Sequence, residues 1–147
     1  MLTQDDVDYL LGLVKVLSEN RSITLPPPGR KLELDVAAKE LKEKFIIDVN
    51  RKGTINIRKA TFQTRYQKSI VLLRLDIEGS PHRNPNDEVI QCPHLHIYKE
   101  GYGTSWAYPL EKEIITDTSD LVQVLIDFLK YNNVITVPPI YQQSLIE

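Results

Sequence analysis

The sequence predicts an α+β domain, in which a twisted antiparallel sheet of four to five strands carries N-terminal and C-terminal helices packed on one face. Apolar residues recur at helical spacing near both ends of the chain, whereas a spacing of two prevails between them. A length of 147 residues with 41% hydrophobic residues is typical of a soluble protein with a single core. We therefore expect residues 1–147 to form one domain.

The first helix is predicted over residues 4–19. Thr3 precedes it as an N-cap, and the acidic residues that follow favour the positive end of the helix dipole. Leu10, Val14 and Leu17 then repeat at helical spacing, which predicts an amphipathic helix.

Three successive prolines predict an extended tether over residues 20–30, because proline has no amide hydrogen to donate. A shorter helix is expected at about 35–45, where Asp35 can cap it. Its apolar side would carry Ala37, Ala38, Leu41 and Phe45.

From about residue 45 to residue 110 the apolar spacing predicts the sheet. A loose connection over residues 80–91 separates its first three strands from the fourth. The predicted strands cover 45–50, 54–66, 70–79, 94–100 and a short stretch within 101–110. A C-terminal helix is expected at about 119–131 with Ser119 as its cap, followed by an extended tail.

All three histidines of the chain lie between residues 82 and 96, in GSPHRNP and CPHLHIYKEGYG. Successive side chains of a strand point to opposite faces, and paired strands must bury their apolar faces together. The apolar face would therefore carry Leu73, Leu75, Leu95 and Ile97. The opposite face would gather the candidate catalytic residues Arg74, Asp76, His94, His96 and Tyr98, with His82 folding over them from its loop.

Charge and cysteine content limit the classes of protein that fit. A net charge of −2 argues against polyanion binding over the whole surface, but residues 51–75 contain seven basic residues and no acidic one. From this stretch we expect RNA contacts by Arg58, Lys59, Arg65 and Lys68. Cys92 is the sole cysteine, which favours a reducing cytoplasm. We expect neither a secretion signal nor a membrane span.

Two chemistries fit the histidines. Without a cofactor, one imidazole could remove the proton of a ribose 2'-hydroxyl while a second, protonated one donates to the leaving oxygen, and Arg74 would offset the phosphate charge. Alternatively, His94 and His96 could bind Zn²⁺ or Mn²⁺, with His82 or Asp76 completing the set. The sequence leaves both open.

HRNP, CPHLHIYKEGYG and WAYPL resemble the core of a small uncharacterised bacterial family, from Phe45 onward. RLDIEGSPH followed by PHLH is also similar to the Arg-x-Asp, Pro-His and Pro-His-x-His pattern of TumE-type toxins of toxin–antitoxin modules. This second likeness implies a site made of Arg74, Asp76, His82, His94 and His96. The spacer is longer here, and Leu95 replaces a polar residue.

These observations predict a toxin-like cytoplasmic protein that acts on RNA, as an endoribonuclease with or without a metal ion. Its partners would be RNA and a cognate antitoxin or another protein. The alternative is a non-catalytic inhibitor or regulator carried by a mobile element, in which the polar face binds a protein and the histidines are structural.

Overall fold

The structure is a computed structural model that describes residues 1–40, 42–53 and 56–142. Leu41, the start of the predicted strand 54–66 and the last five residues of the tail lie outside the described residues. The helices of the described part are α1 (Gln4–Gly12) and α2 (Leu121–Tyr131). Neither helix has the length and apolar character that a membrane crossing requires.

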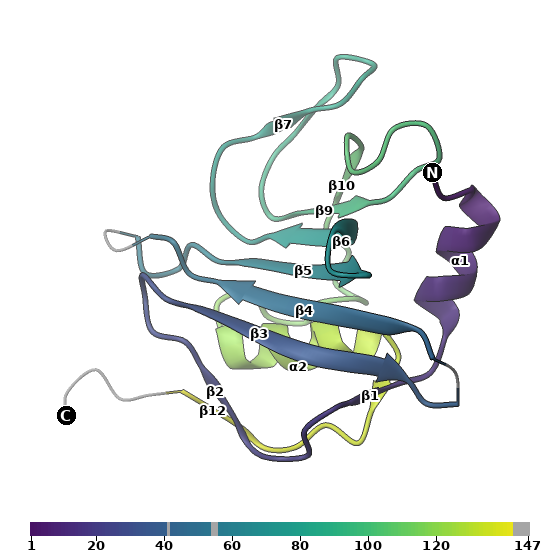
Figure 1. Cartoon of the computed structure of the whole chain (residues 1–147). Helices are drawn as coiled ribbons and strands as arrows, with labels where there is room; N and C mark the ends of the chain where they lie inside the picture. The colour runs from purple at the N-terminus through teal and green to yellow at the C-terminus, as the bar shows by residue number, and fades with distance from the viewer. Residues whose placement is uncertain (41, 54–55, 143–147) are drawn as a thin grey trace.

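Eight strands of the described chain form one sheet in the order β10-β9-β6-β5-β4-β3-β1-β11 (Figure 1). The first five in sequence order are β1 (Lys15–Leu17), β3 (Lys31–Ala38), β4 (Lys44–Asn50), β5 (Thr61–Tyr66) and β6 (Ile70–Asp76). The other three are β9 (His94–Ile97), β10 (Ala107–Pro109) and β11 (Val134–Ile135). All neighbours pair antiparallel except β1 and β11, which are parallel.

The predicted combination of helices with a mainly antiparallel sheet is confirmed, but the predicted number of strands is wrong. Besides the eight-stranded sheet, the described chain holds two short ribbons. The parallel strands β2 (Ile23–Leu25) and β12 (Ile140–Gln142) lie within the predicted tether and the predicted extended tail. The antiparallel strands β7 (His82–Arg83) and β8 (Val89–Ile90) occupy the predicted loose connection.

The prediction of a helix at 35–45 is wrong, because this segment contains the second half of β3 and the start of β4. Leu34 pairs with Ile47 and Val36 pairs with Phe45 across the two strands. The apolar residues of β3 alternate with polar ones, and this period of two buries one face of the strand. The helical periodicity came from residues on both sides of the turn between the strands.

The N-terminal helix is shorter than predicted. Thr3 does cap it, since its side chain accepts from the Asp6 amide and the Asp6 carboxylate accepts from the Thr3 amide. The helix ends at Gly12, and the extended backbone of Leu13 leads into β1. Figure 1 shows α1 beside the ends of the strands. Of the two helices in the described residues, only α2 lies across the face of the sheet, so the predicted packing of both helices on one face is wrong.

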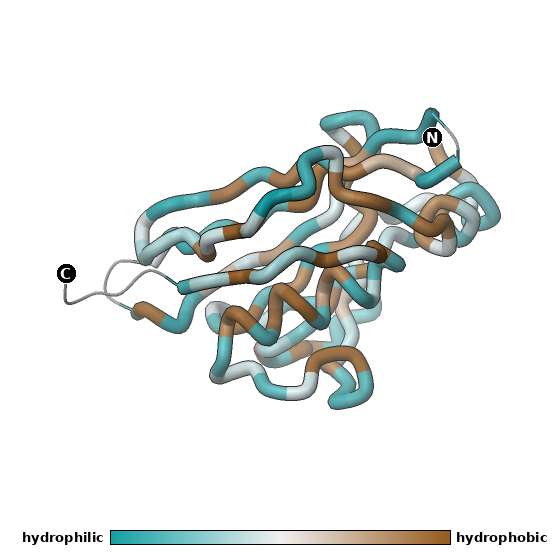
Figure 2. The backbone as a smooth tube through the Cα atoms, turned by 90° about the horizontal axis from the view of Figure 1, so that it is seen from below, coloured by the Kyte–Doolittle hydropathy of each residue, from teal (hydrophilic) through white to brown (hydrophobic). Residues whose placement is uncertain are grey.

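The C-terminal helix begins at Leu121 and is capped by Asp120, whose carboxylate accepts from the amides of Val122 and Gln123. The predicted cap, Ser119, instead donates to the carboxylate of Asp117. Hydrophobic residues recur along α2, as the view from below shows (Figure 2). Its core-facing residues are Val124, Leu125, Phe128 and Leu129.

The apolar face of the sheet packs against α2. Two cross-strand rows make up most of this face between β3 and β9: Leu32, Val49, Phe62, Leu75 and Leu95, and Leu34, Ile47, Thr64, Leu73 and Ile97. The exception among these residues, Thr64, donates its hydroxyl to Asn132 at the end of α2 (2.6 Å). This buried bond fixes the helix on the sheet.

A buried lysine joins both helices to the sheet. The Lys15 ammonium donates to the carbonyl oxygens of Leu11 (3.2 Å), Leu13 (3.0 Å) and Asn132 (2.9 Å). The side chain is fully buried, and this burial lowers the pKa of Lys15 to about 8. One side chain therefore satisfies carbonyl groups at the ends of α1 and α2.

We predict that Lys15→Met lowers the free energy of unfolding by about 2 kcal/mol, because three carbonyl oxygens lose their donor. Between pH 8 and about 10.4 the unfolded Lys15 holds a proton that the folded one has released. Stability from this group therefore rises with pH across that window. Urea unfolding at several pH values measures both effects, with the exposed Lys39→Met as control. Equal pH profiles for wild type and Lys15→Met would contradict the prediction.

Candidate functional site

The register between β6 and β9 places the candidate residues on one face. Asp76 lies opposite His94, and Arg74 lies opposite His96. The alternate residues pair as Leu75 with Leu95 and Leu73 with Ile97 on the face beneath α2. The predicted assignment of these eight residues to two faces is therefore confirmed.

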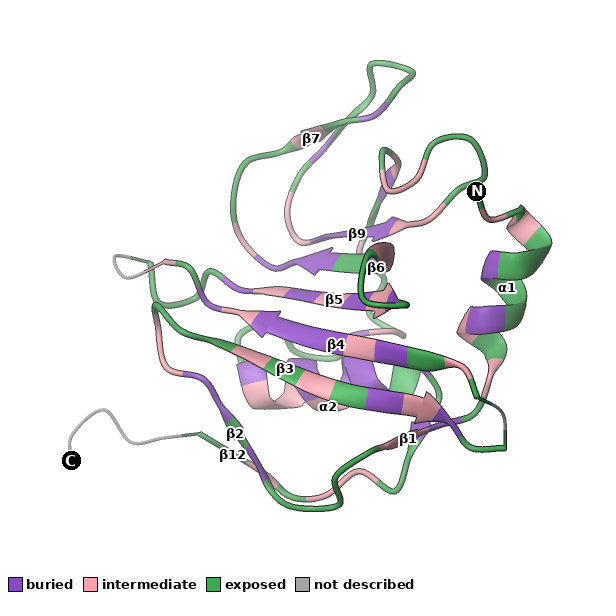
Figure 3. Cartoon of the chain, viewed as in Figure 1, coloured by how far each residue is buried: buried purple, intermediate pink, exposed green. Residues whose placement is uncertain are grey.

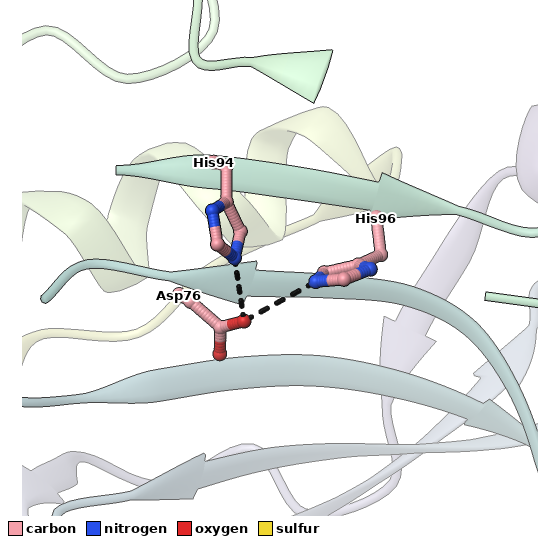
Figure 4. Close-up of side chains that lie close together, drawn as sticks. All are labelled: Asp76, His94 and His96. Carbon is pink, nitrogen blue, oxygen red and sulfur yellow. Dashed lines mark hydrogen bonds and ion pairs between the residues drawn. The ribbon is translucent and has the colours of Figure 1, made fainter. Parts of the chain in front are cut away.

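Both histidines direct a ring nitrogen at the same oxygen of Asp76 (Figure 4). The distances to Asp76 Oδ2 are 3.0 Å from His94 Nε2 and 3.3 Å from His96 Nε2. The other carboxylate oxygen, Oδ1, accepts from the Thr61 hydroxyl (3.0 Å) and from Arg74 Nε (3.1 Å). Burial alone would raise the pKa of Asp76, but a protonated His96 ring beside it and the charge of Arg74 hold this pKa well below its usual range.

The second ring nitrogen of each histidine faces a backbone carbonyl. His94 Nδ1 lies 3.2 Å from the oxygen of Ile90, and His96 Nδ1 lies 2.8 Å from the oxygen of Thr104. A carbonyl oxygen only accepts, so each Nδ1 carries the hydrogen. Each ring is thereby held with Nε2 toward Asp76.

His82 joins the group from β7. Its ring centroid lies 4.6 Å from that of His96 and 6.2 Å from that of His94. The prediction that His82 folds over the polar-face residues from its loop is therefore confirmed. His82 Nε2 bonds the carbonyl oxygen of Ser105 at 2.7 Å, so the loop between β9 and β10 orients both His82 and His96.

His94 and His96 are nearly inaccessible, with exposures of 2% and 6%. They do not lie beneath the helices, since they point away from α2. The segment that the sequence predicts to be a loose connection forms the β7–β8 hairpin, drawn above β9 in Figure 3, and its His82 lies against both rings. Its residue Ile90 is itself buried and supplies the carbonyl that holds His94.

Asn84 attaches this hairpin to the edge of the sheet. Its side-chain amide donates to the Ala107 carbonyl (2.9 Å), and its side-chain oxygen accepts from the Ala107 amide (2.8 Å). The buried asparagine thus pairs with β10 as a strand residue would. Sequence reasoning missed Asn84, because a single asparagine in a Pro-rich segment is typical of an exposed turn.

Tyr98 and Cys92 are close to the histidines in sequence, but neither belongs to the histidine–carboxylate cluster. Tyr98 packs against the hydrophobic core, so the structure does not bring it into the histidine cluster. Cys92 Sγ lies 3.7 Å from His94 Nδ1, and burial raises the pKa of its thiol. Raised thiol pKa values disfavour a nucleophile.

The predicted RNA-binding residues differ in their surroundings. Arg65 contacts Asp48 through two nitrogens, at 2.7 and 2.8 Å, and lies 3.4 Å from Glu33. Arg58 lies 3.4 Å from Glu78. Lys59 and Lys68 are exposed. Acidic residues that are distant in sequence therefore offset part of the positive charge of this basic stretch.

Asp76, His94 and His96 could together hold a metal ion, because one ligand atom from each lies within 4.8 Å of the others. Two imidazoles and one carboxylate suit Zn²⁺ and other transition metal ions. The sequence leaves either His82 or Asp76 as the third ligand. The geometry favours Asp76, which groups with His94 and His96.

The fold and site define a mixed α/β domain with a buried histidine–carboxylate cluster on its polar sheet face. The chain belongs to a family of unknown function (DUF6978), whose family model matches residues 2–134. The match includes both helices, the whole cluster and all strands of the eight-stranded sheet except the second residue of β11. The expected membership of an uncharacterised family is thereby confirmed. No curated protein and no solved structure matches the chain.

We predict that Asn84→Ala lowers the free energy of unfolding by about 2 kcal/mol, because both polar groups of Ala107 lose their partner. Asn86→Ala, in the exposed turn of the same hairpin, should cost about 0.5 kcal/mol or less. Urea unfolding of the two variants measures the difference. Equal costs would show that Asn84 does not anchor the hairpin.

Proposed function

We propose that this protein is a metal-dependent hydrolase that cleaves phosphodiester bonds in RNA, with the ion held by Asp76, His94 and His96. One observation carries the proposal: each histidine gives its Nδ1 hydrogen to a backbone carbonyl and aims Nε2 at one carboxylate oxygen. Metal-binding histidines typically donate their other ring N–H in this way, which fixes the tautomer and raises the basicity of the ligating nitrogen.

The alternative without a metal fits this geometry less well. With its hydrogen on Nδ1, a neutral imidazole points the Nε2 lone pair at the Asp76 carboxylate, and two lone-pair acceptors repel each other. A proton on each ring would relieve the repulsion, but an imidazolium has no lone pair with which to act as a base. A cation bound between Asp76 Oδ2 and the Nε2 atoms of His94 and His96 would remove this repulsion for both rings.

The residues around the cluster support hydrolysis. A divalent ion would supply Lewis acidity and an activated water. Arg74 is half-exposed and contacts Asp76 through Nε, so the rest of its guanidinium can offset charge on a phosphate. His82 is more exposed than the other two histidines. It can transfer a proton between the site and solvent.

RNA as substrate and the toxin role rest on the likeness to TumE-type toxins over residues 74–96. On this proposal the protein acts in the cytoplasm, where Cys92 stays reduced, and a cognate antitoxin would be its protein partner. Arg58, Lys59, Arg65 and Lys68 remain predicted RNA contacts.

Metal binding is the first test. Purified protein should contain or take up one Zn²⁺ or Mn²⁺ per chain, measured by elemental analysis and calorimetry. Asp76→Asn and His96→Ala should each weaken binding by more than about 100-fold, since even the loss of an outer partner costs about 10–100-fold. His82→Gln is the matched control and should bind as wild type does. Equal binding by all variants would place the ion elsewhere.

Catalysis is the second test. Metal-loaded protein should cleave a labelled single-stranded RNA, and a chelator should abolish the cleavage. Arg74→Gln should lower kcat by about 100-fold with the metal content unchanged, because Arg74 acts on the phosphate. Cleavage that survives complete metal removal would contradict the proposed mechanism.

A second candidate function is a non-catalytic interaction protein, which the exposures of 2% for His94 and 6% for His96 favour. In this case the cluster would only hold the β7–β8 hairpin in place. Protein that binds no metal, cleaves no RNA and loses stability in Asp76→Asn would support this function over the hydrolase.

A further inference from the structure

The polar face of the sheet extends well beyond the histidine cluster. Two cross-strand rows lead from β3 to β9 on the side away from α2: Lys31, Asn50, Thr61, Asp76 and His94, and Glu33, Asp48, Gln63, Arg74 and His96. Each row ends at one of the two histidines of the candidate metal site. A ligand lying across the strands would therefore reach that site.

A pocket of about 200 Å³ lies on this face next to the cluster. Its hydrogen-bond donors come from Lys31, Asn50, Lys52, Thr61, Gln63 and Arg74. Thr61 and Arg74 also donate to Asp76 Oδ1, while Oδ2 of the same carboxylate faces the histidines. Two residues that line the pocket, Thr61 and Arg74, therefore also contact the carboxylate of the candidate metal site.

The charges of the pocket favour an anion. Its two acidic residues, Glu33 and Asp48, both pair with Arg65, which offsets one of their two negative charges, while Lys31, Lys52 and Arg74 add three positive charges to the lining. Within the described part of the chain, no acidic group pairs with Lys31 or Lys52. Both lysines are exposed, so their ammonium groups are available to a ligand.

We infer that this pocket binds a phosphate of single-stranded RNA that flanks the bond to be cleaved. The inference rests on the proposed function for its substrate and adds the subsite that holds it. The pocket is lined by residues from β3 to β6, and the cluster lies over β6 and β9, so about two strand spacings, or roughly 10 Å, separate their centres. Lys31 and Lys52 supply point charges, and the amides of Asn50 and Gln63 supply neutral donors.

Binding to RNA without metal tests the subsite apart from catalysis. A fluorescein-labelled RNA of twelve uridines is titrated with chelator-treated protein, and anisotropy is measured at several salt concentrations. Lys31→Gln/Lys52→Gln should weaken binding by roughly tenfold or more and reduce the salt slope by roughly 1.4, about 0.7 for each lost phosphate contact. Lys39→Gln/Lys112→Gln removes the same charge from exposed positions elsewhere and should change neither value appreciably.

The outcomes separate this inference from the proposed function. The phosphate subsite would be overturned if Lys31→Gln/Lys52→Gln kept the affinity and salt slope of the wild type. It would also be overturned if the wild-type protein did not bind the RNA. Loss of binding in Arg58→Gln/Lys59→Gln, with the pocket variant unaffected, would overturn it in favour of the basic stretch. A protein that binds no metal but loses RNA binding in the pocket variant would retain the subsite and refute the hydrolase.

Discussion

The antiparallel register between β6 and β9 is the constraint on which the candidate site depends. It places Asp76 beside His94 and Arg74 beside His96, and the same register buries Leu75 and Leu95 beneath α2. A slip of one residue would move the carboxylate and the imidazoles into the apolar core. The hydrophobic effect that drives the leucines inward therefore also assembles the polar cluster, and no separate interaction is needed to select its members.

This dependence explains why the faces of β6 and β9 could be predicted from the sequence. Alternation is a local property, and the apolar residues of both strands must meet the same core. The prediction did not extend to Leu72, which is buried next to the already buried Leu73. The register between β5 and β6 shifts at Thr64 and Arg65, and such an irregularity disturbs the alternation at one point.

Features that depend on distant partners escaped prediction. The apolar spacing predicts a helix only when residues on both sides of the turn between β3 and β4 are counted together. The pairing of β3 with β4 makes this segment a strand instead. Residues around His82 read as a turn, yet Asn84 reaches Ala107 to fix a hairpin over the site. The sequence predicts Arg65 to be available for RNA, whereas in the structure it pairs with Asp48 on the neighbouring strand. In each case the decisive contact joins segments that are separate in sequence.

The burial of the cluster is difficult to explain by stability alone. Taking a carboxylate and two imidazoles out of water costs several kcal/mol, and well-packed apolar residues of similar volume commonly serve a fold as well or better. The opposite face of the same strands shows this solution, with leucine and isoleucine in the corresponding positions. Three backbone carbonyls, a hairpin and a buried asparagine hold the cluster in place, as the proposed metal site would require. Preorganisation of this kind benefits a bound cation, because the ligands need not rearrange to receive it.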